Sequence, residues 1–212
     1  MTPIVRCAWA NSDLSVAYHD DEWGVASHDD RYLFEMLVLE GAQAGLSWET
    51  ILRKREGYRR RYKNFEPKIV ARFGSREIEA MMGDAALVRN RRKIETSVEN
   101  ARAFLAIARE SGSFARWLWE YVDGRQIVTH RARGEALPAS TELSARIGKD
   151  LYARGFRFVG PTIVYSYLQA VGIVDDHSVD CYRAVEGARK RNRTPGVQYR
   201  ALSFTLLRKA FS

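Results

Sequence analysis

The chain has 212 residues, of which 46% are hydrophobic, and its formal net charge is +8. This length and apolar content allow one substantial core, or two small lobes that share an interface. No stretch is long and apolar enough for a signal peptide or a membrane-spanning helix, so we expect a cytoplasmic protein with reduced thiols and no membrane partner.

The positive charge is distributed unevenly along the chain. Residues 189–212 contain seven lysines and arginines and no acid, which leaves +1 for the first 188 residues. We therefore place a boundary near Gly187, with a single folded unit over 1–187 and a basic C-terminal extension over 188–212. Three roles remain open for this extension: nonspecific affinity for DNA, an interaction function of its own, or a solvated terminus.

Both cysteines of the chain lie near a histidine, one pair at each end of the folded unit. Cys7 and His19 are separated by the polar residues 11–13, which suggest a loop, whereas His177 and Cys181 are spaced by one turn of helix. Two thiolates and two imidazoles are the ligands that a closed tetrahedral zinc site needs. Spacing alone also allows two buried free cysteines beside unrelated histidines, or a disulfide in an oxidising compartment.

Apolar residues recur at helical spacing through most of the chain. Periodicity predicts a helix over Tyr32–Ala44, in which Glu40 lies in line with the apolar positions. Gly45 is expected to end this helix and Ser47 to cap the next one. The strand signal is confined to 126–129, which we interpret as part of a loop, so the expected fold is all-α. Further helices are expected at Arg76–Met82, Arg91–Arg109, Phe114–Val122, Leu143–Arg154 and Pro161–Val171.

Two glycines mark a tight turn between the last two of these helices. Gly155 ends the first helix, and Gly160 followed by Pro161 begins the second. The free N–H groups in the first turn of the second helix can bind a phosphate oxygen. This helix-hairpin-helix pattern predicts a contact with the DNA backbone, and the alternative is an ordinary helical hairpin. The candidate DNA-binding residues are Arg154, Gly155, Arg157, Gly160 and Thr162.

Four segments of the chain, in this order, resemble the bacterial 3-methyladenine DNA glycosylase I family. They are AYHDDEWGV at 17–25, LFEMLVLEGAQAGLSW at 33–48, GFRFVG at 155–160 and DHxxxC at 176–181. The resemblance implies a two-lobed, all-helical fold of the helix-hairpin-helix glycosylase superfamily, in which a zinc ion joins the termini. The implied zinc ligands are Cys7, His19, His177 and Cys181. The implied base pocket consists of Tyr18, Trp23, Glu40 and Trp48, with Trp9 close to it.

The activity implied by the resemblance is a DNA-repair hydrolysis. The N-glycosidic bond of 3-methyladenine in duplex DNA would be cleaved after the nucleotide is flipped out of the helix. No lysine occupies an evident nucleophile position, so we expect a monofunctional glycosylase without lyase activity. We also expect the protein to be a monomer. Zinc with four protein ligands has no open position for water, which makes the ion structural. The alternative function is a catalytically inactive, zinc-clasped DNA-binding module.

The chemistry of the base supports this pocket. Adenine alkylated at N3 is cationic, so its glycosidic bond is weak and the leaving group needs no proton. Aromatic faces at Trp48, Trp23 and Tyr18 can hold such a ring by cation–π attraction. Glu40, the candidate catalytic residue, can accept hydrogen bonds from the base and complement its charge. The alternatives are aromatic core residues and a structural ion pair between Glu40 and an arginine.

Overall fold

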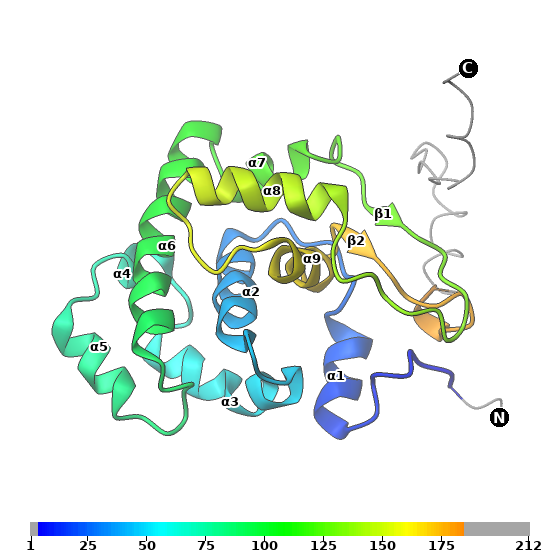
Figure 1. Ribbon diagram of the computed structural model, residues 1–212, viewed down its shortest axis with the longest axis horizontal. Coiled ribbons are helices and arrows are strands. Elements are labelled where there is room, and N and C mark those ends of the chain that lie inside the picture. The colour runs from blue at the N-terminus through cyan, green and yellow to red at the C-terminus, as the bar shows by residue number, and fades with distance from the viewer. Residues whose placement is uncertain (1–3, 185–212) are drawn as a thin grey trace, which may run out of the picture.

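The computed structural model describes residues 4–184, which are mostly helical (Figure 1). Two short strands, β1 (Ile127–Val128) and β2 (Val174–Asp175), accompany the helices. The helices are α1 (Asp13–Asp21), α2 (Asp30–Gln43), α3 (Trp48–Arg61), α4 (Pro67–Val70), α5 (Ser75–Met82), α6 (Arg91–Ser111), α7 (Phe114–Glu120), α8 (Glu142–Ala153) and α9 (Pro161–Ala170).

The helices predicted from periodicity are confirmed, with ends that shift by one or two residues. The capping residues also act as expected. The Ser47 side chain accepts a hydrogen bond from Thr50 N at the start of α3, and Gly160 precedes α9 with Pro161 in the first helical position. These local signals fix where each helix begins because they satisfy, or remove, N–H groups that have no partner within the helix.

Helices α2 and α9 form the centre of the molecule. Helix α9 contacts both α2 and α8, and α6 contacts α2, α4 and α7. Figure 1 shows α9 nearly end-on beside α2, with α8 across the top and α3 below. Leu33 and Leu37 of α2 and Leu168 of α9 are fully or almost fully buried in one core. Glu40 is therefore carried by a helix that is largely enclosed by its neighbours.

The segment between Cys7 and His19 differs from the expected loop. Residues Asp13–Asp21 form α1, and Ser12 caps it reciprocally: Ser12 Oγ accepts from Ser15 N, and Ser15 Oγ accepts from Ser12 N. Such a cap satisfies N–H groups that the first helical turn leaves free. Cys7 therefore lies in a loop, while His19 projects from a helix.

The pair His177 and Cys181 also differs from its expected helical turn. Cys181 ends a tight turn in which its N–H donates to Ser178 O at 2.8 Å, and His177 precedes this turn. Ser178 forms a bridge to Arg131, and β2 just before it pairs in parallel with β1. The region around β1, interpreted as a loop, is thus attached to the C-terminal segment. The expectation of an all-α fold becomes a mostly helical one.

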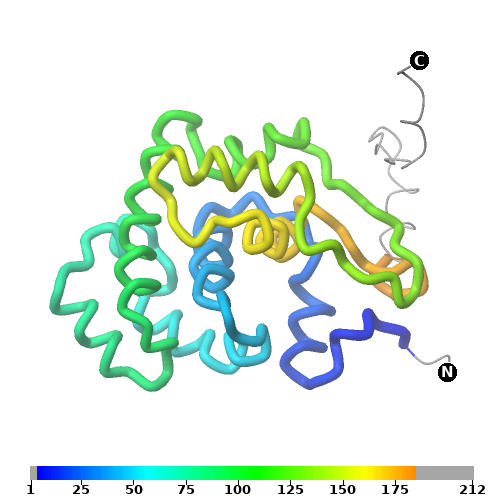
Figure 2. The backbone as a smooth tube through the Cα atoms, in the orientation of Figure 1, coloured from blue at the N-terminus to red at the C-terminus, as the bar shows by residue number. Residues whose placement is uncertain are grey.

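The two ends of the described chain meet on one side of the molecule (Figure 2). Tyr182 N donates to Val5 O at 2.9 Å, and the Arg6 guanidinium lies 5.7 Å from the centre of the Tyr182 ring. No helix within residues 4–184 has the length and apolar content needed to cross a membrane. The predicted boundary near Gly187 and the extension over 188–212 lie outside the described residues.

Candidate functional site

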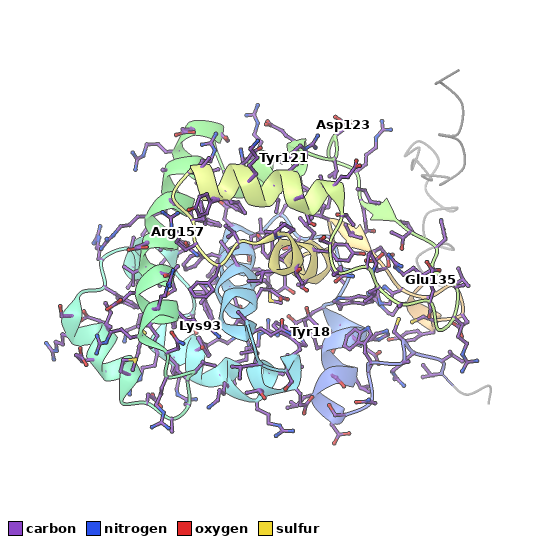
Figure 3. The ribbon with its side chains drawn as sticks, viewed as in Figure 1. Tyr18, Lys93, Tyr121, Asp123, Glu135 and Arg157 are labelled. Atoms are coloured by element: carbon purple, nitrogen blue, oxygen red, sulfur yellow. The ribbon has the colours of Figure 1, made fainter. Side chains whose placement is uncertain are left out.

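Four aromatic side chains predicted for the base pocket form a continuous row. Trp48 begins α3, and its ring centroid lies 5.2 Å from that of Tyr18 on α1. Trp9 precedes α1 and lies 6.2 Å from Tyr18 and 5.0 Å from Trp23. Tyr18 and Trp23 are buried, whereas Trp9 and Trp48 are half-buried. Figure 3 shows Tyr18 between α1 and α2, the helix that carries Glu40.

The Glu40 carboxyl group is buried near the C-terminal end of α2. Glu40 is 4% exposed, and its Oε2 has no hydrogen-bond partner within residues 4–184. Burial raises the pKa of Glu40 from 4.5 to about 8, because the carboxylate charge is disfavoured away from water. Burial also raises the pKa of Tyr18, and the nearby Glu40 charge adds to this effect. Trp48 Nε1 is likewise buried and unpaired, and unpaired donors and acceptors of this kind suit a polar ligand.

The structural ion pair considered for Glu40 is formed instead by Glu35, on the same helix. Arg55 of α3 donates from Nε to Glu35 Oε1 at 2.7 Å. Its Nη1 and Nη2 donate to the two oxygens of Glu22, also at 2.7 Å. Arg59 adds a second hydrogen bond to Glu35 at 2.9 Å. This network joins α2 and α3 to the end of α1, and so holds together the helices that carry the candidate base-binding residues.

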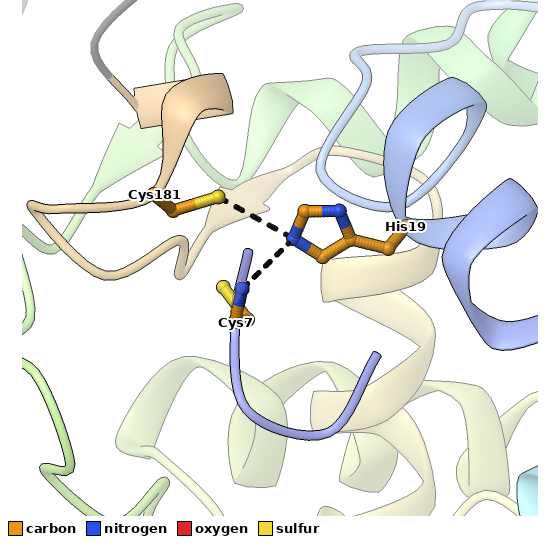
Figure 4. A group of neighbouring side chains, drawn as sticks. All are labelled: Cys7, His19 and Cys181. Atoms are coloured by element: carbon orange, nitrogen blue, oxygen red, sulfur yellow. Dashed lines mark hydrogen bonds between the residues drawn. The ribbon is translucent and has the colours of Figure 1, made fainter. Parts of the chain in front are cut away.

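Three of the four predicted zinc ligands lie together (Figure 4). The ligand atoms of Cys7, His19 and Cys181 all lie within 4.8 Å of one another, and the three residues are buried. His19 Nε2 is 3.4 Å from Cys181 Sγ. Both cysteines are free thiols rather than a disulfide. The close approach of the two thiols lowers the pKa of Cys181 and raises that of Cys7, and the thiolate is the form that binds metal.

His177 lies beside this group of three but is not part of it. Its ring centroid is 4.9 Å from that of His19, and its Nε2 is buried without a partner in the described part of the chain. In both His19 and His177, the Nδ1 atom of the imidazole lies beside a carboxylate. His19 Nδ1 lies 2.8 Å from Asp20, and His177 Nδ1 lies 2.7 Å from Asp175. Histidines that bind metal commonly carry such a carboxylate, which orients the ring and leaves Nε2 for the ion.

Trp23 connects the aromatic row to the metal-ligand residues. Its ring centroid lies 4.6 Å from that of His177 and 6.1 Å from that of His19. The next residue, Gly24, has a φ of +74°, and a Cβ atom there would lie 2.9 Å from His177 Cε1. Glycine is required at this position because a side chain would displace the imidazole. Trp23 thus contacts the histidines as well as Trp9, a role that the sequence analysis did not foresee.

Helices α8 and α9, with the turn between them, form the predicted helical hairpin. Gly155 has a φ of +94°, and the apolar residues Phe156 and Val159 are buried. The Asn100 side chain of α6 forms two hydrogen bonds with the backbone of Arg157 in this turn. Its Nδ2 donates to Arg157 O at 3.0 Å, and its Oδ1 accepts from Arg157 N at 2.9 Å. The turn is therefore fixed to the long helix α6 rather than free to move.

A groove of about 690 Å³ follows this hairpin. Three basic side chains line it, namely Arg92 of α6, Lys149 of α8 and Arg157 of the turn, and its lining contains no acid. Gly160 lies in the same groove. Arg92 and Lys149 were not among the residues predicted to bind DNA, although residues 89–93 include four basic side chains that could have indicated Arg92.

The other predicted DNA-binding residues lie at the two ends of the turn. Gly155 and Thr162 are exposed. Arg154 is also exposed, but its guanidinium donates to Glu110 at 2.6 Å and lies 5.8 Å from the ring centroid of Trp117. Its charge is therefore partly compensated within the protein. A DNA contact by these residues stays a prediction.

Known proteins resemble this chain over nearly all of its described length. The methyladenine glycosylase family matches residues 9–184. DNA-3-methyladenine glycosylase 1 of Escherichia coli (strain K12) is 45% identical over 177 residues, which are 83% of this chain and 95% of that protein. A crystal structure of 3-methyladenine DNA glycosylase I, 45% identical, superposes with a TM-score of 0.81 and covers 84% of this chain and 98% of that one. A structure on the recognition of 3-methyladenine by 3-methyladenine DNA glycosylase I from Staphylococcus aureus, 36% identical, also gives 0.81 and covers 84% and 95%. The chain belongs to the methyladenine glycosylase family.

Proposed function

We propose that this protein is a DNA glycosylase that hydrolyses the N-glycosidic bond of 3-methyladenine in alkylated duplex DNA. The observation that carries the proposal is the buried, unpaired carboxyl oxygen of Glu40 close to Tyr18, whose ring lies against that of Trp48, in a chain of this family. Relatives from E. coli and Haemophilus influenzae that are named DNA-3-methyladenine glycosylases, 45% and 41% identical, support the same reaction.

Charge is the basis on which this site would select the base. Methylation at N3 makes adenine cationic, and the faces of Tyr18 and Trp48 attract a cation. Without a ligand, Glu40 is largely protonated at neutral pH because its pKa is about 8. A cationic base beside it favours the carboxylate, so binding releases a proton. Unmodified adenine is neutral, so it gains neither the attraction of a Glu40 carboxylate nor the cation–π attraction of the rings.

Bond cleavage follows from the same charge. The electron pair of the C1′–N bond moves to the base, which leaves as neutral 3-methyladenine without being protonated by the protein. The electron-poor C1′ takes the oxygen of water, and the water proton is lost. Because this bond is enclosed in the duplex, the nucleotide must first flip out of the base stack. No amine of the protein attacks C1′, so the DNA strand is not cut.

The hairpin is the proposed contact with the DNA backbone. Exposed N–H groups at the start of α9 and the basic side chains of the groove are suited to phosphate oxygens. We therefore assign the fold to the helix-hairpin-helix glycosylase superfamily, with two helical lobes. The same proposal places the protein, as a monomer, in the bacterial cytoplasm where its DNA substrate lies.

A structural zinc ion is also part of this proposal. Cys7, His19, His177 and Cys181 would hold it, and the unpaired Nε2 of His177 supports this set of donors. Four protein ligands leave no position for water, so the ion would tie the two ends of the fold together. Chelation, or Cys181→Ser, should lower the melting temperature before the pocket changes. Unchanged thermal stability after verified metal removal would contradict the structural role.

A base-release assay tests the enzymatic proposal. Methylated duplex DNA is incubated with the protein, and the released base is identified by chromatography, with unmethylated duplex as the control. We expect 3-methyladenine to be released well above the spontaneous rate. Release at the spontaneous rate alone would refute the proposal. Duplex affinity measured in parallel separates the alternative, because an inactive DNA-binding module would bind the methylated duplex without releasing base.

A further inference from the structure

Lys93 lies in the first turn of α6 but directs its charge to another helix. The first turn of a helix disfavours cations because the dipole is positive there. The Lys93 ammonium group instead donates to Ala42 O at 2.9 Å and to Ala44 O at 2.5 Å. Both carbonyl groups lie at the C-terminal end of α2, where backbone acceptors lack helical partners and the dipole is negative. Lys93 therefore caps α2 from the side of α6 (Figure 3).

The segment that follows α2 has few other constraints. Gly45 has a φ of +78°, no atom lies within 4 Å of the place where a Cβ would stand, and Leu46 is 41% exposed. Ser47 bonds to Thr50 at the start of its own helix. Among residues 4–184, Lys93 supplies the side-chain hydrogen bonds that reach the 42–47 segment from a different element. The geometry of this segment thus depends strongly on one ammonium group.

We propose that Lys93 is a positioning residue for the base-binding site. Glu40 lies in the last turn of α2, and Trp48 is the first residue of α3, so the segment between the two helices sets the position of one relative to the other. By fixing the end of α2, Lys93 holds the carboxyl group of Glu40 and the ring of Trp48 at the spacing that a flat base requires. This inference rests on the proposed function, because it concerns the same site.

The test compares two lysines that make the same kind of bond. Lys93→Met removes the ammonium group and keeps an apolar stem. Lys54→Met is the matched control, because Lys54 is also a half-buried lysine that donates to a backbone carbonyl, Ala85 O at 2.6 Å, in the loop after α5. We expect Lys93→Met to weaken binding of free 3-methyladenine, followed by tryptophan fluorescence, and to slow single-turnover excision, each by about tenfold or more. Affinity for unmodified duplex should not change, and Lys54→Met should change none of the three.

Two results would overturn this inference. The first is a Lys93→Met protein with a lower melting temperature but wild-type affinity for the base once folded, which is what a purely structural role predicts. The second is a Lys93→Arg protein, which keeps cationic donors, that loses as much affinity as Lys93→Met. If Lys93→Met does not fold, Lys93→Gln replaces it in both comparisons. A wild-type protein that releases no 3-methyladenine contradicts the proposed function instead, whereas wild-type release with an unaffected Lys93 variant contradicts this inference alone.

Discussion

Glu35 and Glu40 are two buried glutamates on the same helix, and their surroundings are opposite. Glu35 accepts hydrogen bonds from Arg55 and Arg59 at 2.7 and 2.9 Å. Glu40 leaves Oε2 unpaired in the described structure, and burial raises its pKa to about 8. A buried carboxyl group without a partner costs stability. Glu35 therefore belongs to the framework, while Glu40 is kept available for a ligand at the expense of the fold.

The different surroundings of Glu35 and Glu40 depend on which acids the nearby arginine pairs with. The guanidinium of Arg55 is occupied by Glu22 and Glu35. An arginine paired with Glu40 would stabilise the fold, but it would also neutralise the carboxylate and repel a cationic base. Arg55 thus pairs with other acids, and a cationic substrate would neutralise the charge of Glu40 instead.

The largest expected effect tests the framework side of this comparison. Arg55→Met leaves Glu22 and Glu35 without their main partner, and losing one member of a buried ion pair should lower the free energy of unfolding by roughly 3–5 kcal/mol. Urea denaturation measures this change. The control is Arg53→Met, because the exposed Arg53 pairs with Glu49 at 3.3 Å, and such a pair is worth about 0–1 kcal/mol. Equal losses in the two variants would show that the buried network does not organise the fold.

The ligand side of the comparison is tested by activity. Glu40→Gln keeps the shape of the side chain but removes the charge that complements a cationic base, so single-turnover excision of 3-methyladenine should fall by about a hundredfold. Glu35→Gln is the matched control, since it makes the same change five positions earlier on α2. Folded Glu35→Gln protein should be less stable but excise the base at close to the wild-type rate. If both variants lose activity equally, the division between the two glutamates is wrong.

Although Glu40→Gln should lose activity, the raised pKa of Glu40 predicts that this variant is more stable than the wild-type protein at neutral pH. The folded protein holds this proton up to about pH 8, whereas the unfolded chain releases it near its usual pKa of 4.5. The wild-type protein therefore loses stability as the pH rises from 4.5 to about 8, at up to about 1.4 kcal/mol per pH unit. Glu40→Gln lacks this loss and should gain on wild type across the same range. Denaturation at several pH values measures the difference, and a difference that does not change with pH would show that Glu40 has no raised pKa.

Local patterns predicted much of the fold but could not distinguish the two glutamates. Periodicity placed Glu40 correctly among the buried positions of α2, because that signal lies within a few residues. The partner of Glu35 is Arg55, twenty residues away, and their pairing depends on how α3 packs against α2. A local sequence pattern contains no information about this packing, so it cannot decide which of the two glutamates forms the structural ion pair.

The ends of the fold show the same limit. Cys7, His19 and Cys181 were predicted to lie together from their residue types alone, and the structure confirms this proximity although they are far apart in the chain. The predicted local conformations of these residues were wrong. Helix α1 depends on a serine cap that the sequence analysis overlooked. The turn before Cys181 depends on the pairing of β1 with β2, which are distant in the sequence. Strands of two residues carry too little alternation to be detected.

Paired and unpaired charges also occur side by side at the start of α6, and here the smallest effect is expected. Arg91 donates to Glu79 at 2.8 and 3.0 Å, whereas Arg92 lines the hairpin groove and has no partner among residues 4–184. If the groove binds phosphates, Arg92→Ala should reduce the slope of log affinity against log salt concentration by about 1, measured by fluorescence anisotropy with unmodified duplex. Arg91→Ala removes the same charge one residue away and should leave the slope near that of wild type, because Glu79 already occupies it. Equal reductions would mean that DNA responds to the overall charge of this turn and not to Arg92 in particular. The absence of a partner would then indicate a ligand contact only for a buried side chain such as Glu40, and not for an exposed one.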